Sequence, residues 1–388
     1  MLVHICCSVD SHYFLSELKK KYPDEDFVGF FYNPNIHPKS EYDLRLSDVQ
    51  RSCDMLGIRL IEGAYNDRHW FVGVRGMENE PEKGERCLKC FDIRLTESAK
   101  KAQELGEQKF TTTLLSSPMK EQEILYKQGD QIGMQMGLDF IKVNVRSNGG
   151  VQRQNELAKQ DNLYRQNYCG CTFALSQQRQ KQNRLSLEMI SDIGGRKLPG
   201  SIEERQEIFA LRDMLEKNNQ HYILTQRKKI TWRLLSGKIS QNGNVIPSYI
   251  LAHSDSKDCK SGQIFWGYTQ IATQTFHNAT HNTTSQNPPL CQKLLIGISK
   301  KDDSVYLTLD SLNTLAQTSY KDIVDMLYNP LSYECELHIR KIICGDESIN
   351  PIIIIENPIY DNVKITIQSV FQEEKIFQVV DFVDFNQR

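Results

Sequence analysis

The chain opens with Leu2-Val3-His4-Ile5-Cys6-Cys7, a short apolar run that ends in two adjacent cysteines. A helical pattern follows over 11–21, and a second apolar run occupies 27–31. This order of strand, helix and strand predicts parallel strands joined by a right-handed crossover. Ligands of such sheets bind at the carboxyl ends of the strands. Cys6 and Cys7 therefore stand where a site is expected.

The same alternation continues through the first half of the chain. We expect further helices over 41–56, 91–105 and 120–136, and further strands over 58–61, 109–115 and 139–145. The pattern predicts an α/β fold, a parallel sheet with helices on both faces. Beyond a helix expected over 202–217, strand runs separated by turn signals predict a mostly β region, with a polar loop over 278–289. We therefore expect two domains, residues 1–200 and residues 201–388.

Composition excludes several classes of protein. The 388 residues are 25% charged and 39% hydrophobic, which is typical of a globular chain and not of a disordered one. The longest apolar run, Ile352 to Ile355, is far shorter than the ~18 to 20 residues that span a bilayer, so we expect no membrane segment and a buried strand instead. The N-terminus lacks the basic and apolar regions of a signal peptide, which favours a cytoplasmic location.

Six of the eleven cysteines form three local pairs. Cys6 and Cys7 end the first expected strand, Cys87-Leu88-Lys89-Cys90 precedes an expected helix, and Cys169-Gly170-Cys171 precedes another. Clustered thiols in a reducing compartment are more often metal ligands or catalytic groups than disulfides. Zinc or an iron–sulfur cluster takes four thiolates, which leaves two for a further role. For any single pair, buried structural thiols or a dithiol redox pair remain open.

Asp10 lies four residues after Cys6, near the start of the first expected helix. It could cap that helix, in competition with Ser8, or complement the helix dipole. Its carboxylate, beside two spare thiolates, would instead suit a second iron that acts as a Lewis acid.

Basic residues are concentrated in one segment. The formal net charge of the chain is −2, yet residues 142–200 hold ten Lys or Arg against four acidic residues. A polyanion could dock there, or the charges could cover an exposed helical face. The chain has no glycine-rich phosphate loop, which argues against nucleotide hydrolysis.

Five motifs occur in order along residues 1–182. They are His4 to Cys7 with Asp10, Phe31 to Pro38 with Glu41 and Tyr42, Gly84 to Cys90 with Arg94, Phe110 to Leu115 with Ser117 to Lys120, and Tyr168 to Cys171. Together these motifs resemble the cobalamin-independent epoxyqueuosine reductase family, QueH. The resemblance implies a nucleotide-hydrolase-like, Rossmann-like fold that holds a 4Fe-4S cluster and an additional mononuclear iron. The compact members have no counterpart of the last two hundred or so residues, whose role stays open.

The resemblance also implies an activity and site residues. Members of this family reduce epoxyqueuosine to queuosine at the wobble position of tRNA. We therefore expect two partners, the tRNA anticodon stem-loop that carries epoxyqueuosine and an external low-potential electron donor. Asp10 matches the iron-binding carboxylate of the family. The matching metal-binding cysteines are Cys6, Cys7, Cys87, Cys90, Cys169 and Cys171, and their division between the two centres stays open.

The implied reaction needs proton donors within hydrogen-bond reach of the substrate. The candidates are Tyr32, His37, Lys120 and, if it is not a ligand, Asp10. Tyr32 could instead pack beside the sheet, His37 could order a loop, and Lys120 could pair with a phosphate. Two other functions remain open: a non-catalytic, zinc-binding RNA-binding module, and an ATP-dependent tRNA-modifying enzyme of related fold that has lost its phosphate loop.

Overall fold

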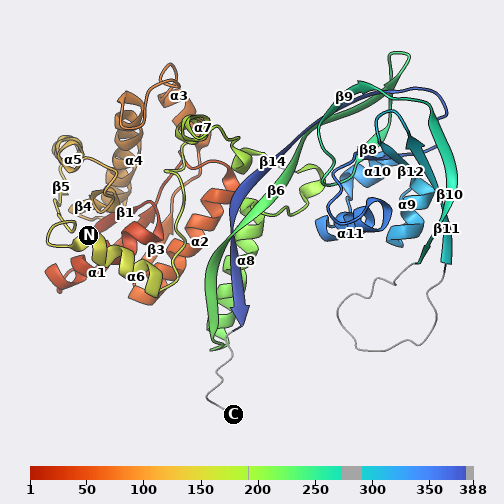
Figure 1. Cartoon of the computed structure of the whole chain (residues 1–388). Helices are drawn as coiled ribbons and strands as arrows, with labels where there is room; N and C mark the ends of the chain where they lie inside the picture. The colour runs from red at the N-terminus through yellow and green to blue at the C-terminus, as the bar shows by residue number, and fades with distance from the viewer. Residues whose placement is uncertain (191, 273–290, 382–388) are drawn as a thin grey trace, which may run out of the picture. The chain divides into compact units, whose positions relative to one another are not determined.

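The computed structural model describes residues 1–190, 192–272 and 291–381 (Figure 1). The chain forms two compact units. The first contains residues 1–190, 205–225 and the described residues from 377 on, and the second contains the described residues of 191–204 and 226–376. The division into domains 1–200 and 201–388 stays a prediction. The loop expected over 278–289 lies outside the described residues.

A five-stranded parallel sheet, in the order β3-β2-β1-β4-β5, forms the centre of the first unit. Its strands are β1 (Leu2–Ile5), β2 (Val28–Phe31), β3 (Arg59–Glu62), β4 (Lys109–Thr112) and β5 (Asp139–Phe140). All residues of the central strand β1 are buried, as expected for a parallel strand covered on both faces. The predicted α/β fold is confirmed, although the last strand is shorter than the predicted 139–145.

Helices follow the strands in the chain and flank the sheet. They are α1 (Ser8–Lys21), α2 (Lys39–Leu56), α3 (Asp67–Gly73), α4 (Glu85–Glu104), α5 (Gln122–Met136), α6 (Gly150–Gln160), α7 (Thr172–Lys181) and α8 (Ile202–Lys217), with 3-10 turns η1 (Thr113–Leu115) and η2 (Leu187–Met189). Helix α1 packs against α2 and α6, and α4 packs against α5. Gly57 and Gly137 end α2 and α5 in the left-handed conformation, which glycine adopts without steric cost.

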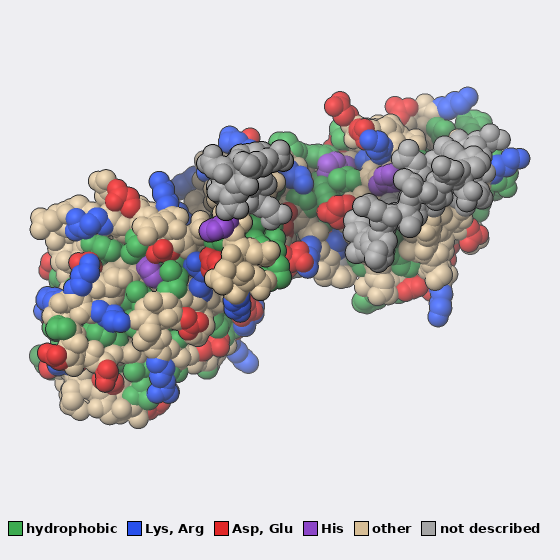
Figure 2. Space-filling model, turned by 90° about the horizontal axis from the view of Figure 1, so that it is seen from below, with side chains coloured by type: hydrophobic (Ala, Val, Ile, Leu, Met, Phe, Trp, Pro, Cys, Tyr) green, Lys and Arg blue, Asp and Glu red, His purple; other side chains and the backbone are tan. Residues whose placement is uncertain are grey.

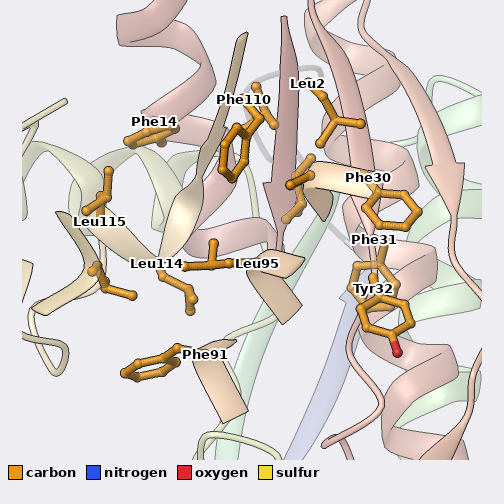
Figure 3. Packing of buried hydrophobic residues seen from close by; sticks show 14 of the residues in the cluster. Leu2, Phe14, Phe30, Phe31, Tyr32, Phe91, Leu95, Phe110, Leu114 and Leu115 are labelled. Atoms are coloured by element: carbon orange, nitrogen blue, oxygen red, sulfur yellow. The ribbon is translucent and has the colours of Figure 1, made fainter. Parts of the chain in front are cut away.

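The core of the first unit lies against the sheet, where aromatic and leucine side chains interdigitate (Figure 3). The Phe110 and Phe140 rings meet edge to face, with centroids 5.1 Å apart. A Cβ atom at residue 129 would lie 2.4 Å from the Phe140 ring, so only glycine lets α5 approach the sheet this closely. This packing fixes the sheet whose carboxyl edge carries the site.

The later half of the chain contains two more sheets, in the orders β10-β11-β12-β13-β8 and β7-β6-β14-β9. The strands are β6 (Tyr222–Gln241), β7 (Asn244–Ile246), β8 (Ser248–Ile250), β9 (Lys257–Lys260), β10 (Ile264–Ala272), β11 (Cys291–Ser299), β12 (Val305–Thr308), β13 (Ile352–Ile355) and β14 (Lys364–Asp381). Strand β13 is fully buried, as its four isoleucines predict. The predicted mostly β region is confirmed.

Three helices in this region were not predicted from the sequence. They are α9 (Leu309–Ala316), α10 (Ile323–Tyr328) and α11 (Tyr333–Cys344), and a 3-10 turn, η3 (Ile193–Gly195), lies earlier in the chain. All three begin with a side-chain cap, from Thr308, Asp322 and Ser332. None of the helices in the described part of the chain is long and apolar enough to cross a bilayer.

Candidate functional site

The first strand brings two adjacent cysteines to the edge of the sheet. Cys6 follows β1 directly, and Cys7 is the N-cap residue of α1. Cys7 makes no side-chain cap hydrogen bond, and the Ser8 hydroxyl donates instead to the Asp48 carboxylate. The capping role considered for Asp10 and Ser8 is therefore wrong, since both residues lie inside the helix.

Cys6, Cys7 and Asp10 offer three ligand atoms in a small space. Cys6 Sγ lies 3.8 Å from Cys7 Sγ and 3.8 Å from Asp10 Oδ2, and the three ligand atoms lie within 4.8 Å of one another. Gln154 Nε2 donates to the other carboxylate oxygen, Asp10 Oδ1, at 2.8 Å, which holds Oδ2 toward the thiols. Two thiols and a carboxylate in this space form a donor set for a metal ion.

The electrostatics of this group favour one thiolate. The hydrogen bond between Cys6 and Cys7 lowers the pKa of Cys6 to about 5, and the Arg94 guanidinium contributes to the shift against the effect of burial. The same hydrogen bond and burial raise the pKa of Cys7 well above its ordinary value. Burial, followed by the Cys6 thiolate, raises the pKa of Asp10 to about 7. An arriving cation would therefore meet one ready thiolate and displace protons from the other two groups.

The second pair lies inside a helix, whereas the sequence pattern predicted it before one. Helix α4 begins at Glu85, so Cys87 and Cys90 occupy its first turns, three residues apart and on one face. Arg86 Nη1 donates to three backbone carbonyls within residues 77–80, at distances from 2.6 to 3.1 Å. These bonds fix the loop that leads into the helix.

The third pair flanks a glycine just before α7, as predicted. Gly170 has a φ of 108°, and a Cβ atom there would lie 2.8 Å from Ile36, so the turn requires glycine. The Arg45 guanidinium donates to the backbone carbonyls of residues 168 and 169, at 3.0 and 3.2 Å. Cys169 and Cys171 are thereby held in place from α2.

Lys120 lies among these thiols and shifts their titration. The hydrogen bond from Cys171 lowers the pKa of Cys169 to about 6, and the Lys120 ammonium adds to this effect. Burial tends to lower the pKa of Lys120, but the Cys169 and Cys87 thiols outweigh burial and the net pKa is raised. Lys120 therefore keeps its positive charge beside Cys87 and Cys169.

The three pairs converge on one cavity of about 530 Å³. Five of the six paired cysteines line it, all except Cys7, and Asp10 and Lys120 line it too. From sequence, Arg94 was named in a family motif but given no role at the site, whereas in the structure it lines the same cavity and donates to Asn33 Oδ1 at 2.6 Å. The signal was available, because Arg94 lies four residues after Cys90 on the same helical face.

Two of the predicted proton donors lie elsewhere. Tyr32 stacks on Phe30 with ring centroids 5.9 Å apart, and it is not among the residues that line the cavity. The His37 ring packs against Trp70 and Phe71, with centroids 5.2 and 4.7 Å away, and does not line the cavity either. The donor roles of Tyr32 and His37 stay predictions.

The buried His37 ring should make the first unit less stable as the pH falls. Burial lowers the pKa of His37 to about 4. Between pH 6.5 and 4 the unfolded chain binds this proton and the folded one does not, so stability falls as pH falls, by up to about 3 kcal/mol for this residue. We expect His37→Phe to reduce the loss of stability between pH 7 and pH 5, measured as the urea midpoint of the first unit by pulse proteolysis. The exposed His69→Phe is the control, and an equal acid loss in wild type and His37→Phe would contradict the assignment.

Some basic side chains of the segment 142–200 form ion pairs or hydrogen bonds within the protein. Arg179 forms a buried ion pair with Glu188, and Arg146 donates to the backbone carbonyls of Leu115 and Lys120, each at 2.7 Å. On the molecular face drawn in Figure 2, basic and acidic side chains are interspersed and do not gather by sign. A docking surface in this segment stays a prediction.

A parallel α/β sheet whose carboxyl edge gathers thiols and a carboxylate around a cavity defines a candidate metal-binding protein of the α/β class. The family model described as Epoxyqueuosine reductase QueH matches residues 1–177. Epoxyqueuosine reductase QueH from Helicobacter pylori is 43% identical over 390 residues, which cover 98% of this chain and 100% of the relative. The chain belongs to the epoxyqueuosine reductase QueH family.

Other relatives match a smaller share of the chain. Epoxyqueuosine reductase QueH from Thermotoga maritima is 34% identical over 189 residues, 48% of this chain and 95% of the relative. The later half of the chain thus has a counterpart in the Helicobacter pylori relative and none in this compact one. Among solved structures, the U34-tRNA thiolase NcsA from Methanococcus maripaludis shares 16% identity over 56% of this chain and 67% of that chain, with a TM-score of 0.31, too low to carry an argument.

Proposed function

We propose that this protein reduces epoxyqueuosine to queuosine at the wobble position of tRNA in the cytoplasm. Its relatives are named epoxyqueuosine reductases, which supports the reduction of epoxyqueuosine. The observation that carries the proposal is the convergence of five paired cysteines and Asp10 on one cavity, in a chain of this family. Its partners are then the anticodon stem-loop of tRNA and an external low-potential electron donor.

The donor set fits two metal centres. Six thiols exceed the four that one cluster takes. We assign Cys6, Cys7 and Asp10 to a mononuclear iron, because their ligand atoms lie within 4.8 Å of one another. The 4Fe-4S cluster then falls to Cys87, Cys90, Cys169 and Cys171, which line the same cavity and lie close enough that the charge on one raises the pKa of another. When bound, the two centres supply electrons and a Lewis acid.

The chain itself must hold and deliver protons. Conversion of the epoxide to an alkene breaks both C–O bonds, forms a C=C bond, consumes two electrons and two protons, and releases the oxygen as water. Lys120 and Asp10 are the predicted donors that line the cavity. A metal-bound Asp10 cannot also donate, so the assignment leaves Lys120 as the donor on this wall. The buried Arg94, which lines the same cavity, adds a fixed positive charge that favours an anionic oxygen.

Loss of any paired thiol is expected to lower the bound iron. Single Cys→Ser changes at the six paired positions each remove one soft ligand. In protein purified without oxygen, the bound iron should fall in all six variants. Acid-labile sulfide should fall in the variants of Cys87, Cys90, Cys169 and Cys171, which are assigned to the cluster, and stay normal in those of Cys6 and Cys7. The rate of epoxyqueuosine reduction in tRNA, measured by nucleoside analysis, should also fall. Loss of a residue that only hydrogen-bonds a metal ligand costs about 10- to 100-fold, and loss of a ligand itself should cost at least as much.

The unpaired cysteines provide the matched controls. Cys53 is fully buried, and Cys259, Cys335 and Cys344 are half-buried, and none of the four is among the residues that line the cavity. The side chain of Cys291 lies outside the described residues, but Cys291→Ser belongs to the same control group. Equal iron loss in both groups would contradict the proposal. A colourless protein that holds zinc would favour the alternative of an RNA-binding module without catalysis.

A further inference from the structure

Several buried polar groups around the cavity are left without hydrogen-bond partners. Asn35 and Trp70 are 3% and 0% exposed and line the cavity, yet Asn35 Oδ1 and Trp70 Nε1 have no partner among the described residues. The same holds for Nε and Nη2 of Arg86, which is 1% exposed, and for Oε1 of the half-buried Gln166. Buried polar atoms are nearly always paired in native proteins, so a group of orphans on one cavity points to a ligand.

The chemistry of the orphans describes the ligand. Asn35 Oδ1 and Gln166 Oε1 are acceptors and need two N–H donors, whereas Arg86 Nε and Nη2 are donors and need an acceptor. Among the common bases, guanine alone presents two neighbouring donor groups, N1–H and the 2-amino group, beside a carbonyl acceptor. Bases of single-stranded RNA loops are commonly splayed out and read along this edge.

We propose that Asn35 and Gln166 read the donor edge of the wobble base, and that Arg86 reads its carbonyl oxygen. The inference rests on the proposed function, since epoxyqueuosine keeps the hydrogen-bonding edge of guanine. Asn35 lies in the loop after β2, and Gln166 lies in the loop before Cys169. These two loops adjoin, because His37 N donates to Gly170 O at 2.9 Å. The base edge is thus held by residues that are not predicted metal ligands.

The test uses anticodon stem-loop RNAs with guanine or hypoxanthine at the wobble position, because hypoxanthine lacks only the 2-amino group. Iron-loaded wild-type protein should bind the guanine loop about tenfold more tightly, since loss of one donor leaves a buried acceptor unpaired. Of Asn35→Leu and Gln166→Leu, the variant that removes the acceptor of the 2-amino group should bind both loops alike, with unchanged iron content and visible absorbance. Gln166→Leu is the second variant, because this half-buried side chain carries less risk to folding. Asn79→Leu, an exposed residue outside the cavity lining, is the matched control.

Two results would overturn the inference. One is a wild-type protein that binds both loops equally. The other is a guanine preference that persists unchanged in both Asn35→Leu and Gln166→Leu. A third result separates the two proposals. If the wild-type protein prefers guanine, one of the two variants loses this preference, and the wild-type protein does not reduce epoxyqueuosine, then the base-reading role is supported and the proposed activity is wrong.

Discussion

Under the proposed assignment of the ligands, Asp10→Asn should keep the four irons of the proposed cluster, lose the proposed mononuclear iron and lose most of the epoxyqueuosine reduction. The change keeps the shape of the side chain and an oxygen that can accept from Gln154 Nε2, now 2.8 Å from Asp10 Oδ1. It removes the anionic oxygen that lies 3.8 Å from Cys6 Sγ. Because the assigned iron has only three protein ligands, we expect turnover to fall by about 100-fold or more. Iron analysis, visible absorbance and nucleoside analysis under chemical reductant measure the three effects.

The exposed Asp24→Asn is the control for this experiment, since Asp24 is not among the residues that line the cavity. A structural role for Asp10 predicts a different pattern, in which stability falls while iron and turnover per folded molecule stay normal. Wild-type turnover in Asp10→Asn would remove Asp10 as an iron ligand and the Lewis-acid role with it.

Arg212→Ala should strongly destabilise the first unit, although Arg212 lies beyond the predicted domain boundary. Arg212 Nη1 lies 2.6 Å from Asp48 Oδ1, and both side chains are 1% exposed. Asp48 Oδ2 also accepts from the Ser8 hydroxyl and from Tyr164 N, so this carboxylate joins α8 to the start of α1 beside Cys7. Removal of one partner of a buried ion pair costs about 3 to 5 kcal/mol, because the other charge is left uncompensated.

Hydrogen exchange of peptides from α1 and α2, together with urea unfolding of the first unit, measures this loss. The exposed Arg75→Ala is the control and should change the free energy of unfolding by less than about 0.5 kcal/mol. A double-mutant cycle with Asp48→Asn separates the pair from the other bonds of Asp48. A coupling energy near zero would contradict a role for this pair in stability.

The sheet could be predicted from sequence because its signal is local. Apolar runs such as Leu2 to Ile5 alternate with helical periodicity, and this pattern alone predicts parallel strands with helical crossovers. The boundary at residue 200 follows from a change of pattern, whereas contacts such as Arg212 with Asp48 join residues 164 positions apart. Periodicity holds no information about such pairs.

The site was predicted in part for the same reason. Paired thiols and Asp10 are recognisable as donor sets by residue type and spacing, and the resemblance to a family named them as ligands. Asn35 and Gln166 carry no such signal, because an unpaired buried amide is defined only by its surroundings. His37 and Tyr32 show the converse, since residue type suggested chemistry and the fold placed both rings away from the cavity lining.

The first unit is discontinuous in sequence, and this has a consequence for the newly made chain. The Phe377 ring packs 5.0 Å from Phe209 and 6.0 Å from Tyr164, all within the first unit. A ribosome adds about 5 to 20 residues per second, so roughly 10 to 40 s separate the synthesis of residue 190 from that of Phe377. During that interval the cysteine-bearing sheet can form while its packing is incomplete. Nascent chains therefore carry the six paired thiols before the first unit is complete, whereas iron delivered after release from the ribosome would meet a finished unit.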